Sequence, residues 1–178
     1  MELNIFADAI EKYKLKLTEE QVLDFLRINH RWNHRNYFPV EVINNLKTIE
    51  TKSFYNINGE FVFDSWYDYF KKGFTSIISN VLDLNHDLRK FREFLHKHTG
   101  TEMWCNFYFS RPGNTPSFGG HKHEYDVIVK QIYGKTTWLI GKQIIVLQPQ
   151  KTLVIPKGFV HQVVDKAENK LSLTMNLE

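Results

Sequence analysis

The stretch Val127–Leu147, VIVKQIYGKTTWLIGKQIIVL, decides the fold of this chain. It divides at Gly134 and Gly141 into three short runs rich in β-branched residues, a pattern typical of strands joined by tight turns. With similar runs on either side, the sequence predicts seven strands: Met103–Phe109, Val127–Tyr133, Thr136–Ile140, Gln143–Leu147, Thr152–Ile155, Val160–Val164 and Leu171–Leu177. Strands spaced this closely, without helices between them, favour an antiparallel sandwich or barrel over a parallel sheet.

The last of these runs has two chemically different faces. Because successive strand residues point to opposite sides, Leu171, Leu173 and Met175 share one face with Leu177. The opposite face is polar and consists of Ser172, Thr174 and Asn176. We therefore expect one side of this strand to pack on the core and the other to face water or a polar cavity.

Residues 1–100 predict mainly helices. Thr18 and Gln21 have the spacing of a capping box, in which each side chain satisfies a main-chain amide at a helix start. The predicted helices are Glu19–His30, a short one from Pro39, one from Trp66 to Val81 capped by Asp64-Ser65, and Leu88–Lys97, with a small hairpin around Asn58-Gly59. We expect this helical region to pack on a barrel formed by residues 101–178. The two parts would make one structural unit of α+β class that is mainly β.

The composition excludes several classes of protein. Aromatic residues make up 15% of the 178 residues, which excludes a disordered chain. No apolar run approaches the roughly 20 residues that cross a bilayer, so no membrane partner is expected. The net charge of +3 comes from lysines and arginines scattered among acids, which does not indicate a nucleic-acid partner. The single cysteine, Cys105, excludes an internal disulfide, and the first residues lack a secretory pattern, so we expect a cytoplasmic location.

Three histidines carry the chemistry that the sequence predicts. His121 and His123 follow two glycines and would point to the same face of an extended segment. His161 follows the turn Pro156–Gly158. Imidazole is the commonest metal ligand, and three of them leave positions open for a substrate or water. The alternative interpretation of His121 and His123 is a solvated glycine-rich loop, and that of His161 is a surface histidine after a turn. The other histidines lack such a framework and are interpreted as surface or structural residues: His30, His34, His86, His96 and His98.

Two segments of the chain resemble a known superfamily. Pro156–His161, PKGFVH, matches the second cupin motif, Pro-x-Gly-x-x-His. Residues 106–138 resemble the jumonji-C-type branch, which includes the ribosomal oxygenases and related protein hydroxylases. The matching residues are Asn106, Tyr108, Pro112, Gly113, His121, Asp126, Val127, Gln131, Gly134 and Trp138. The resemblance covers about residues 102–178. It implies a double-stranded β-helix, also called a cupin or jelly-roll barrel, that holds Fe(II) and uses 2-oxoglutarate and O2 to hydroxylate a C–H group.

The chain departs from this branch at two positions. The branch binds its metal with His-x-Asp/Glu and a distant His, whereas His123 stands here in place of the carboxylate. Its members often hold the distal carboxylate of 2-oxoglutarate with a Lys or Arg two residues after the glycine matched by Gly134. That position is Thr136, whose hydroxyl gives a weaker contact than a cation. Lys130 is an alternative cation, although its strand parity is opposite to that of the two histidines. The other candidates for the cosubstrate pocket are Asn106, Tyr108, Thr136, Ser172, Thr174 and Asn176.

Three hypotheses follow for the function. The first is a 2-oxoglutarate-dependent Fe(II) oxygenase that acts on a peptide, a protein or a small molecule. The second is a three-histidine metal cupin that works without 2-oxoglutarate as a dioxygenase, lyase or isomerase, since thiol dioxygenases have such a site. The third is a non-catalytic barrel that binds a metal or another ligand. A homodimer also stays open, and the open roles for residues 1–100 are a lid, a recognition surface and a dimer contact.

Overall fold

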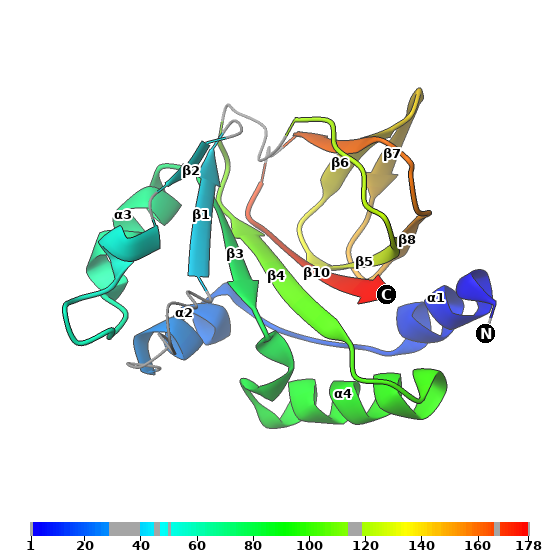
Figure 1. The fold of residues 1–178 in the computed structure, drawn as a ribbon, viewed down its shortest axis with the longest axis horizontal. Coiled ribbons are helices and arrows are strands. Elements are labelled where there is room, and N and C mark those ends of the chain that lie inside the picture. The colour runs from blue at the N-terminus through cyan, green and yellow to red at the C-terminus, as the bar shows by residue number, and fades with distance from the viewer. Residues whose placement is uncertain are drawn as a thin grey trace.

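The structure is a computed structural model that describes residues 2–28, 40–44, 47–49, 51–113, 119–165 and 168–177. Within these ranges the chain forms two antiparallel sheets and four α-helices (Figure 1). The helices are α1 Leu3–Lys12, α2 Glu19–Ile28, α3 Phe63–Lys71 and α4 His86–Thr99, with short 3₁₀ helices at Thr51–Phe54 and Val81–Asp83. None of the described helices is long and apolar enough to cross a membrane.

The larger sheet runs through both halves of the chain. Its strands are β1 Val40–Asn44, β2 Lys47–Ile49, β3 Thr75–Ser79, β4 Trp104–Ser110, β5 Asp126–Tyr133, β8 Thr152–Ile155 and β10 Lys170–Leu177. They are arranged in the order β2-β1-β3-β4-β10-β5-β8. Because β3 pairs with β4, the strands of residues 40–79 continue the sheet that begins in residues 104–177. The predicted boundary near residue 100 therefore falls between two neighbouring strands of one sheet.

The smaller sheet closes the barrel. It consists of β6 Thr136–Ile140, β7 Gln143–Leu147 and β9 His161–Asp165, in the order β7-β6-β9. Figure 1 shows it facing the end of the large sheet that carries β10, β5 and β8. The seven strands predicted between residues 103 and 177 are all confirmed, and no bound differs from the prediction by more than one residue. The predicted α+β, mainly β, barrel-type fold is therefore confirmed.

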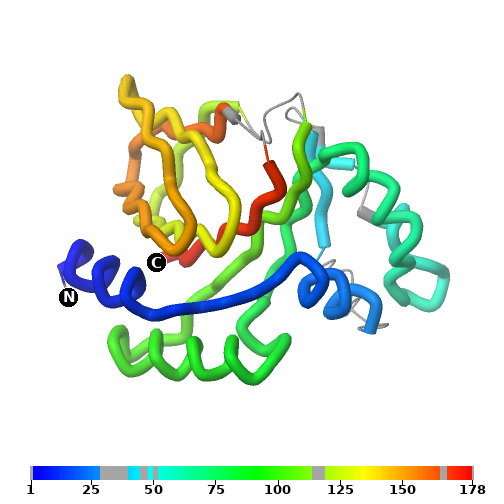
Figure 2. The backbone as a smooth tube through the Cα atoms, turned by 180° about the vertical axis from the view of Figure 1, so that it is seen from behind, coloured from blue at the N-terminus to red at the C-terminus, as the bar shows by residue number. Residues whose placement is uncertain are grey.

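The helices cover the outer face of the large sheet. Figure 2 shows α1 beside the barrel and α2 at the far end, with the segment between them running along the sheet near α4. Leu171, Leu173 and Met175 of β10 are fully buried in the core on this face. The opposite, polar face of β10 looks into the barrel, so the two faces that the sequence alternation predicts are both present.

The capping box predicted at the start of α2 is confirmed. The Thr18 hydroxyl accepts the Gln21 N–H at 3.2 Å, and the Gln21 side-chain oxygen accepts the Thr18 N–H at 2.9 Å, as a capping box requires. Gly100 ends α4 with φ +73°, a conformation that favours glycine. The end of the first predicted helix, residues 29 and 30, lies outside the described residues.

Two helix predictions are wrong and are corrected here. Val40–Asn44 is strand β1, which pairs with β2 on one side and β3 on the other. The helix predicted over residues 66–81 begins earlier, with Val62 as its N-cap, and ends at Lys71. Gly73 then turns the chain with φ +79°, and Thr75–Ser79 forms β3 between β1 and β4. In both places the β-branched residues pair inside a sheet, and this tertiary pairing overrides the local helical spacing.

Candidate metal centre

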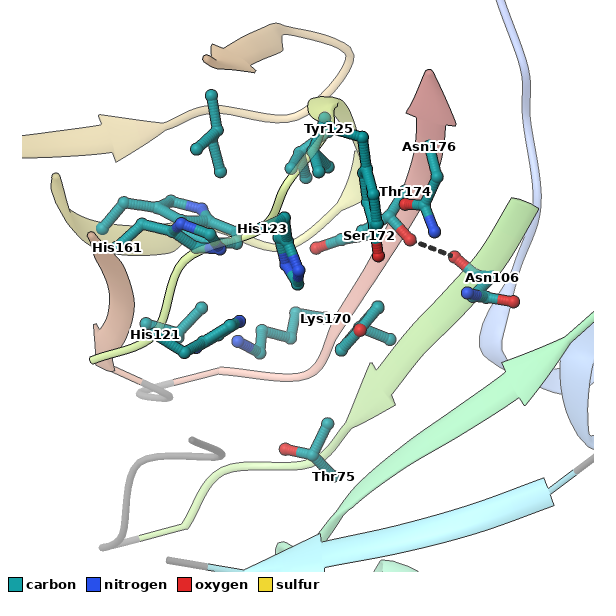
Figure 3. A pocket seen from close by; sticks show the side chains of 16 residues that line it. Thr75, Asn106, His121, His123, Tyr125, His161, Lys170, Ser172, Thr174 and Asn176 are labelled. Atoms are coloured by element: carbon teal, nitrogen blue, oxygen red, sulfur yellow. Dashed lines mark hydrogen bonds between the residues drawn. The ribbon is translucent and has the colours of Figure 1, made fainter. Parts of the chain in front are cut away.

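His121, His123 and His161 come together at one end of the barrel (Figure 3). One ligand nitrogen from each ring lies within 4.8 Å of the other two. His121 and His123 stand on the segment before β5, and His161 is the first residue of β9. The fold therefore brings two distant segments of the sequence to one point, as a shared metal ion would require.

The main chain holds these two segments against each other. The His121 N–H donates to the His161 carbonyl at 3.1 Å, and the His161 N–H donates to the His121 carbonyl at 2.8 Å. A third main-chain bond joins the Gly158 N–H to the His123 carbonyl at 2.9 Å. These bonds bring the main chain at the three histidines together.

Backbone carbonyls also fix two of the rings. The Nδ1 of His121 lies 3.0 Å from the Gly119 carbonyl, and the Nδ1 of His161 lies 2.9 Å from the Phe159 carbonyl. A carbonyl oxygen only accepts, so Nδ1 carries the hydrogen and the lone pair stands on Nε2. This second hydrogen bond is the arrangement that orients a metal-binding imidazole and sets its tautomer.

The third ring is oriented by an aromatic neighbour. His123 stacks on Tyr125 with ring centres 5.0 Å apart and ring planes 11° from parallel. Burial lowers the pKa of His123, and the neighbouring His121 and His161 lower it further. Burial also lowers the pKa of His161, against an opposing effect of its hydrogen bond to Phe159. Both shifts favour the neutral imidazole, which is the form that binds metals.

The donor set fits a divalent first-row transition ion. Three neutral imidazoles suit iron, nickel, copper or zinc, whereas hard ions such as magnesium prefer oxygen ligands. Three protein ligands leave coordination positions open for small molecules. The residues present therefore fit a metal centre with room for additional ligands.

A cavity of about 140 Å³ adjoins the histidines. It lies inside the barrel and has the size of cavities that hold a small organic molecule. The residues that line it are Thr75, Asn106, Tyr108, His121, His123, Tyr125, Val127, Val129, Trp138, Ile155, His161, Val163, Lys170, Ser172, Thr174 and Asn176. No Asp or Glu belongs to this lining in the part of the chain that the structure describes.

Five residues that the sequence suggested for a cosubstrate pocket line this cavity: Asn106, Tyr108, Ser172, Thr174 and Asn176. Asn106 and Tyr108 come from β4, and the other three come from the polar face of β10. Burial raises the pKa of Tyr108 to about 12, so its phenol stays protonated at neutral pH. Their roles towards a cosubstrate stay predictions.

Thr136 and Lys130, which the sequence also suggested for the cosubstrate, are not among the residues that line this cavity. The Thr136 hydroxyl donates to the side-chain oxygen of Gln131 at 2.8 Å. Lys130 points to the helical face of the sheet, where its ammonium donates to the carbonyls of Ile10 at 3.1 Å and Glu11 at 3.4 Å, at the end of α1. Its strand parity, opposite to that of the cavity residues Val127 and Val129, is the physical reason.

Lys170 is a charged cavity residue that the sequence prediction missed. It is the first residue of β10, is only 2% exposed and lines the cavity. Figure 3 shows its side chain reaching from β10 towards the side of the cavity that holds His121. The available signal was its parity, since Lys170 precedes Ser172 by two residues and shares the polar face of the strand.

Comparisons with known proteins agree with this fold. The chain has the fold of the cupin and jumonji-C class, and three histidines that could hold a metal ion converge in its barrel. Among solved structures it is similar to YcfD, a ribosomal oxygenase from Escherichia coli. The structure of YcfD with cobalt and succinic acid has a TM-score of 0.65 and 14% sequence identity, and covers 94% of this chain. The structure with cobalt and 2-oxoglutarate has a TM-score of 0.63 and 13% identity, and covers the same share.

The similarity to YcfD is limited in sequence identity and in the length of chain that it covers. At this sequence identity it shows the fold, and the match spans 45% of the length of the Escherichia coli chain. A further X-ray structure of the same Escherichia coli protein gives a TM-score of 0.64 at 14% identity, with 94% of this chain and 47% of that chain covered. No protein-family model matches the sequence, and no curated protein matches it.

Proposed function

We propose that this chain is a non-haem Fe(II) oxygenase that hydroxylates a C–H group with 2-oxoglutarate and O2 as cosubstrates. The observation that carries the proposal is the convergence of His121, His123 and His161, with ligand nitrogens within 4.8 Å, beside a cavity in the barrel. The fold likeness to an oxygenase whose solved structures contain cobalt with 2-oxoglutarate or succinic acid supports it.

Each group of the site has a defined task in this proposal. The three imidazoles would hold Fe(II), which when bound supplies the redox chemistry that activates O2. The carbonyls of Gly119 and Phe159 keep two of the rings in the metal-binding tautomer. The apolar side chains of the cavity limit water around the reacting groups, and the neutral Tyr108 phenol forms part of the cavity wall.

A three-histidine enzyme that works without 2-oxoglutarate is the second candidate. It is favoured by two observations, the imidazole of His123 in place of a carboxylate and the engagement of Thr136 with Gln131. A dioxygenase, lyase or isomerase would need the same metal centre but would release no succinate. The two candidates therefore differ in one measurable product.

The substrate of the proposed oxygenase is a peptide or protein side chain, with a small molecule as the alternative. Phe159 and Val160 directly precede His161 and are about half exposed, which offers an apolar surface close to the metal centre. We place the enzyme in the cytoplasm, and a homodimer remains a prediction for the assembly.

The test is anaerobic loading of the purified chain with Fe(II), followed by addition of 2-oxoglutarate and O2. We expect one Fe(II) per chain and release of succinate, and His161→Ala should abolish both. His96→Ala is the matched control, because this histidine is exposed on α4 and outside the cavity lining. Stoichiometric metal without succinate would favour the second candidate. Absence of stoichiometric metal binding would leave a non-catalytic barrel.

A further inference from the structure

We propose that β7 is a contact between two copies of this chain, in which the two β7 strands pair antiparallel about a two-fold axis. The pairing joins the two small sheets into one sheet of order β9-β6-β7-β7-β6-β9. The inference goes beyond the proposed function and does not depend on it, because no residue of Gln143–Leu147 lines the cavity. It places the contact between copies on the barrel and not on residues 1–100.

The edges of the two sheets are the first observation. Within the described residues, β8 is covered by α1, where the Glu11 carboxylate accepts the Thr152 main-chain N–H at 3.0 Å. β9 is bridged to His121 through the two main-chain hydrogen bonds of His161. β2 is only three residues long. β7 is the fourth edge, and it pairs with β6 on one side only. An edge of this kind presents main-chain groups that can pair with another chain.

The composition of β7 is the second observation. Proteins usually protect an exposed edge with charged residues, prolines or bulges. The strand Gln143–Leu147 reads QIIVL, without a charge or a proline, and its pairing with β6 is regular over all five residues. Ile144 is 72% exposed and Val146 is 50% exposed. Figure 1 shows β7 on the outer side of the barrel, away from α2 and α3. This strand is therefore open to a partner strand.

The turn between β6 and β7 determines which main-chain groups face the open edge. The turn has two residues, and Gly141 has φ +58°, as the first central residue of a type II′ hairpin requires. The residues that flank such a turn form a hydrogen-bonded pair, and these pairs alternate along an antiparallel ladder. Because Gln143 flanks the turn, every second residue from it bonds to β6. The N–H and C=O groups of Ile144 and Val146 therefore point to the open edge.

The sequence of β7 is complementary to itself. In an antiparallel pair of β7 strands centred on Ile145, Ile144 of each copy faces Val146 of the other. These are the two residues whose main-chain groups are open, so both cross-strand pairs can be hydrogen-bonded. Their side chains are aliphatic, and the flanking Lys142 faces Gln148, so no like charges meet. A second copy of the chain therefore satisfies this edge in one defined register.

Sedimentation equilibrium of the full chain tests the inference. A single strand pair buries less than the roughly 1,200 Å² of a stable interface, so we expect a dimer with a Kd of about 1–100 µM. Ile144→Lys/Val146→Lys places lysine opposite lysine twice and should weaken the dimer by roughly 2- to 30-fold. Ile144→Lys/Val146→Glu places lysine opposite glutamate twice, and it should dimerise about as well as wild type.

Ile57→Lys is the matched control. Ile57 is fully exposed in the turn before α3 and lies outside β7, so this variant should dimerise like wild type. Far-UV circular dichroism verifies that each variant is folded. If the double lysine variant does not fold, Val146→Pro decides, because it removes an N–H that faces the open edge and leaves the bonds to β6 in place.

Two results would overturn the inference. The first is a wild-type chain that stays monomeric up to about 500 µM, well above the expected Kd. The second is a dimer that both double variants retain with equal affinity, or that Val146→Pro retains, because the contact would then lie elsewhere on the molecule. Loss of the dimer with two lysines and its recovery with the lysine–glutamate pair would support the pairing of β7 with itself in the stated register.

Discussion

His121 and His161 are joined by two main-chain hydrogen bonds of 3.1 and 2.8 Å, one in each direction. This pairing connects the segment before β5 to the start of β9 at the point where the candidate ligands stand. The positions of both residues are thus set by the fold. A metal ion bound here would meet a site that is already assembled, which differs from small domains that fold only when they bind metal.

The first prediction concerns the metal-free protein. Addition of Fe(II) or Co(II) should leave the far-UV circular dichroism spectrum unchanged and should raise the melting temperature. Ligand binding to the folded state alone stabilises it by about 2.7 kcal/mol when the free metal is at 100 times its Kd. A large gain of strand signal on metal addition would contradict the preassembled site. His161→Ala should remove the rise in melting temperature.

The second prediction concerns Tyr125, which stacks on His123. Tyr125→Phe keeps an aromatic ring and should leave metal affinity within about twofold of wild type, whereas Tyr125→Ala should weaken it. An aromatic pair contributes about 0.5–1.5 kcal/mol beyond burial, which corresponds to roughly a 2- to 12-fold loss of affinity. Competition with a coloured chelator measures the difference. Equal losses in both variants would show that the phenol, and not the ring, orients His123.

The third prediction concerns the identity of the ligand at position 123. His123→Asp adds a negative charge and an oxygen donor, so it should shift selectivity from Ni(II) towards Mn(II). We expect a change in the affinity ratio of roughly tenfold, or about 1.4 kcal/mol. Competitive loading followed by elemental analysis measures it. His123→Gln is the control, since it removes the imidazole without adding charge and should weaken both ions.

Much of the barrel was predictable because its signals are local. Glycines separate short β-branched runs from residue 127 onward, and every one of these runs is a strand. Val40–Asn44 and Thr75–Ser79 were not recognised, because short apolar runs fit helix and strand spacing equally well. Their strand pairing with each other, and that of Thr75–Ser79 with β4, depends on contacts distant in sequence. No local pattern in the sequence contains that information.

The candidate site was predictable to the extent that it rests on motifs. The three histidines were found from their spacing and from the turn before His161, and the structure brings them together. Lys170 lacked such a signal, because it stands at the extreme start of its strand, and the predicted strand began one residue later at Leu171. Thr136 was placed by resemblance alone, but its hydroxyl is held by Gln131. Parity along the strands is a physical rule that separates Lys130 from the cavity, although the sequence analysis kept this lysine as an alternative cation.

The last prediction concerns the pH dependence of stability. Lys130 is fully buried, and burial, with a smaller effect of Lys14, lowers its pKa to about 8. Because an unfolded lysine has a pKa of about 10.4, the unfolded chain binds more protons than the folded protein between these two values. Stability contributed by this group therefore increases as the pH rises from about 8 to about 10.4, and its full cost is present below about pH 8.

Chemical denaturation of wild type and Lys130→Met at pH 7.5 and 9.5 tests this prediction. Deprotonation of Lys130 should stabilise the wild type over this interval by on the order of 1–2 kcal/mol relative to the variant. The test compares the two proteins because the buried thiol of Cys105 also makes stability depend on pH. Its pKa is raised to about 12, so its contribution to stability falls as the pH rises, equally in both proteins. Lys130→Met should also be less stable than wild type above pH 9, since it leaves the Ile10 and Glu11 carbonyls at the end of α1 without their donor. Identical pH profiles would mean that Lys130 keeps an ordinary pKa despite its burial.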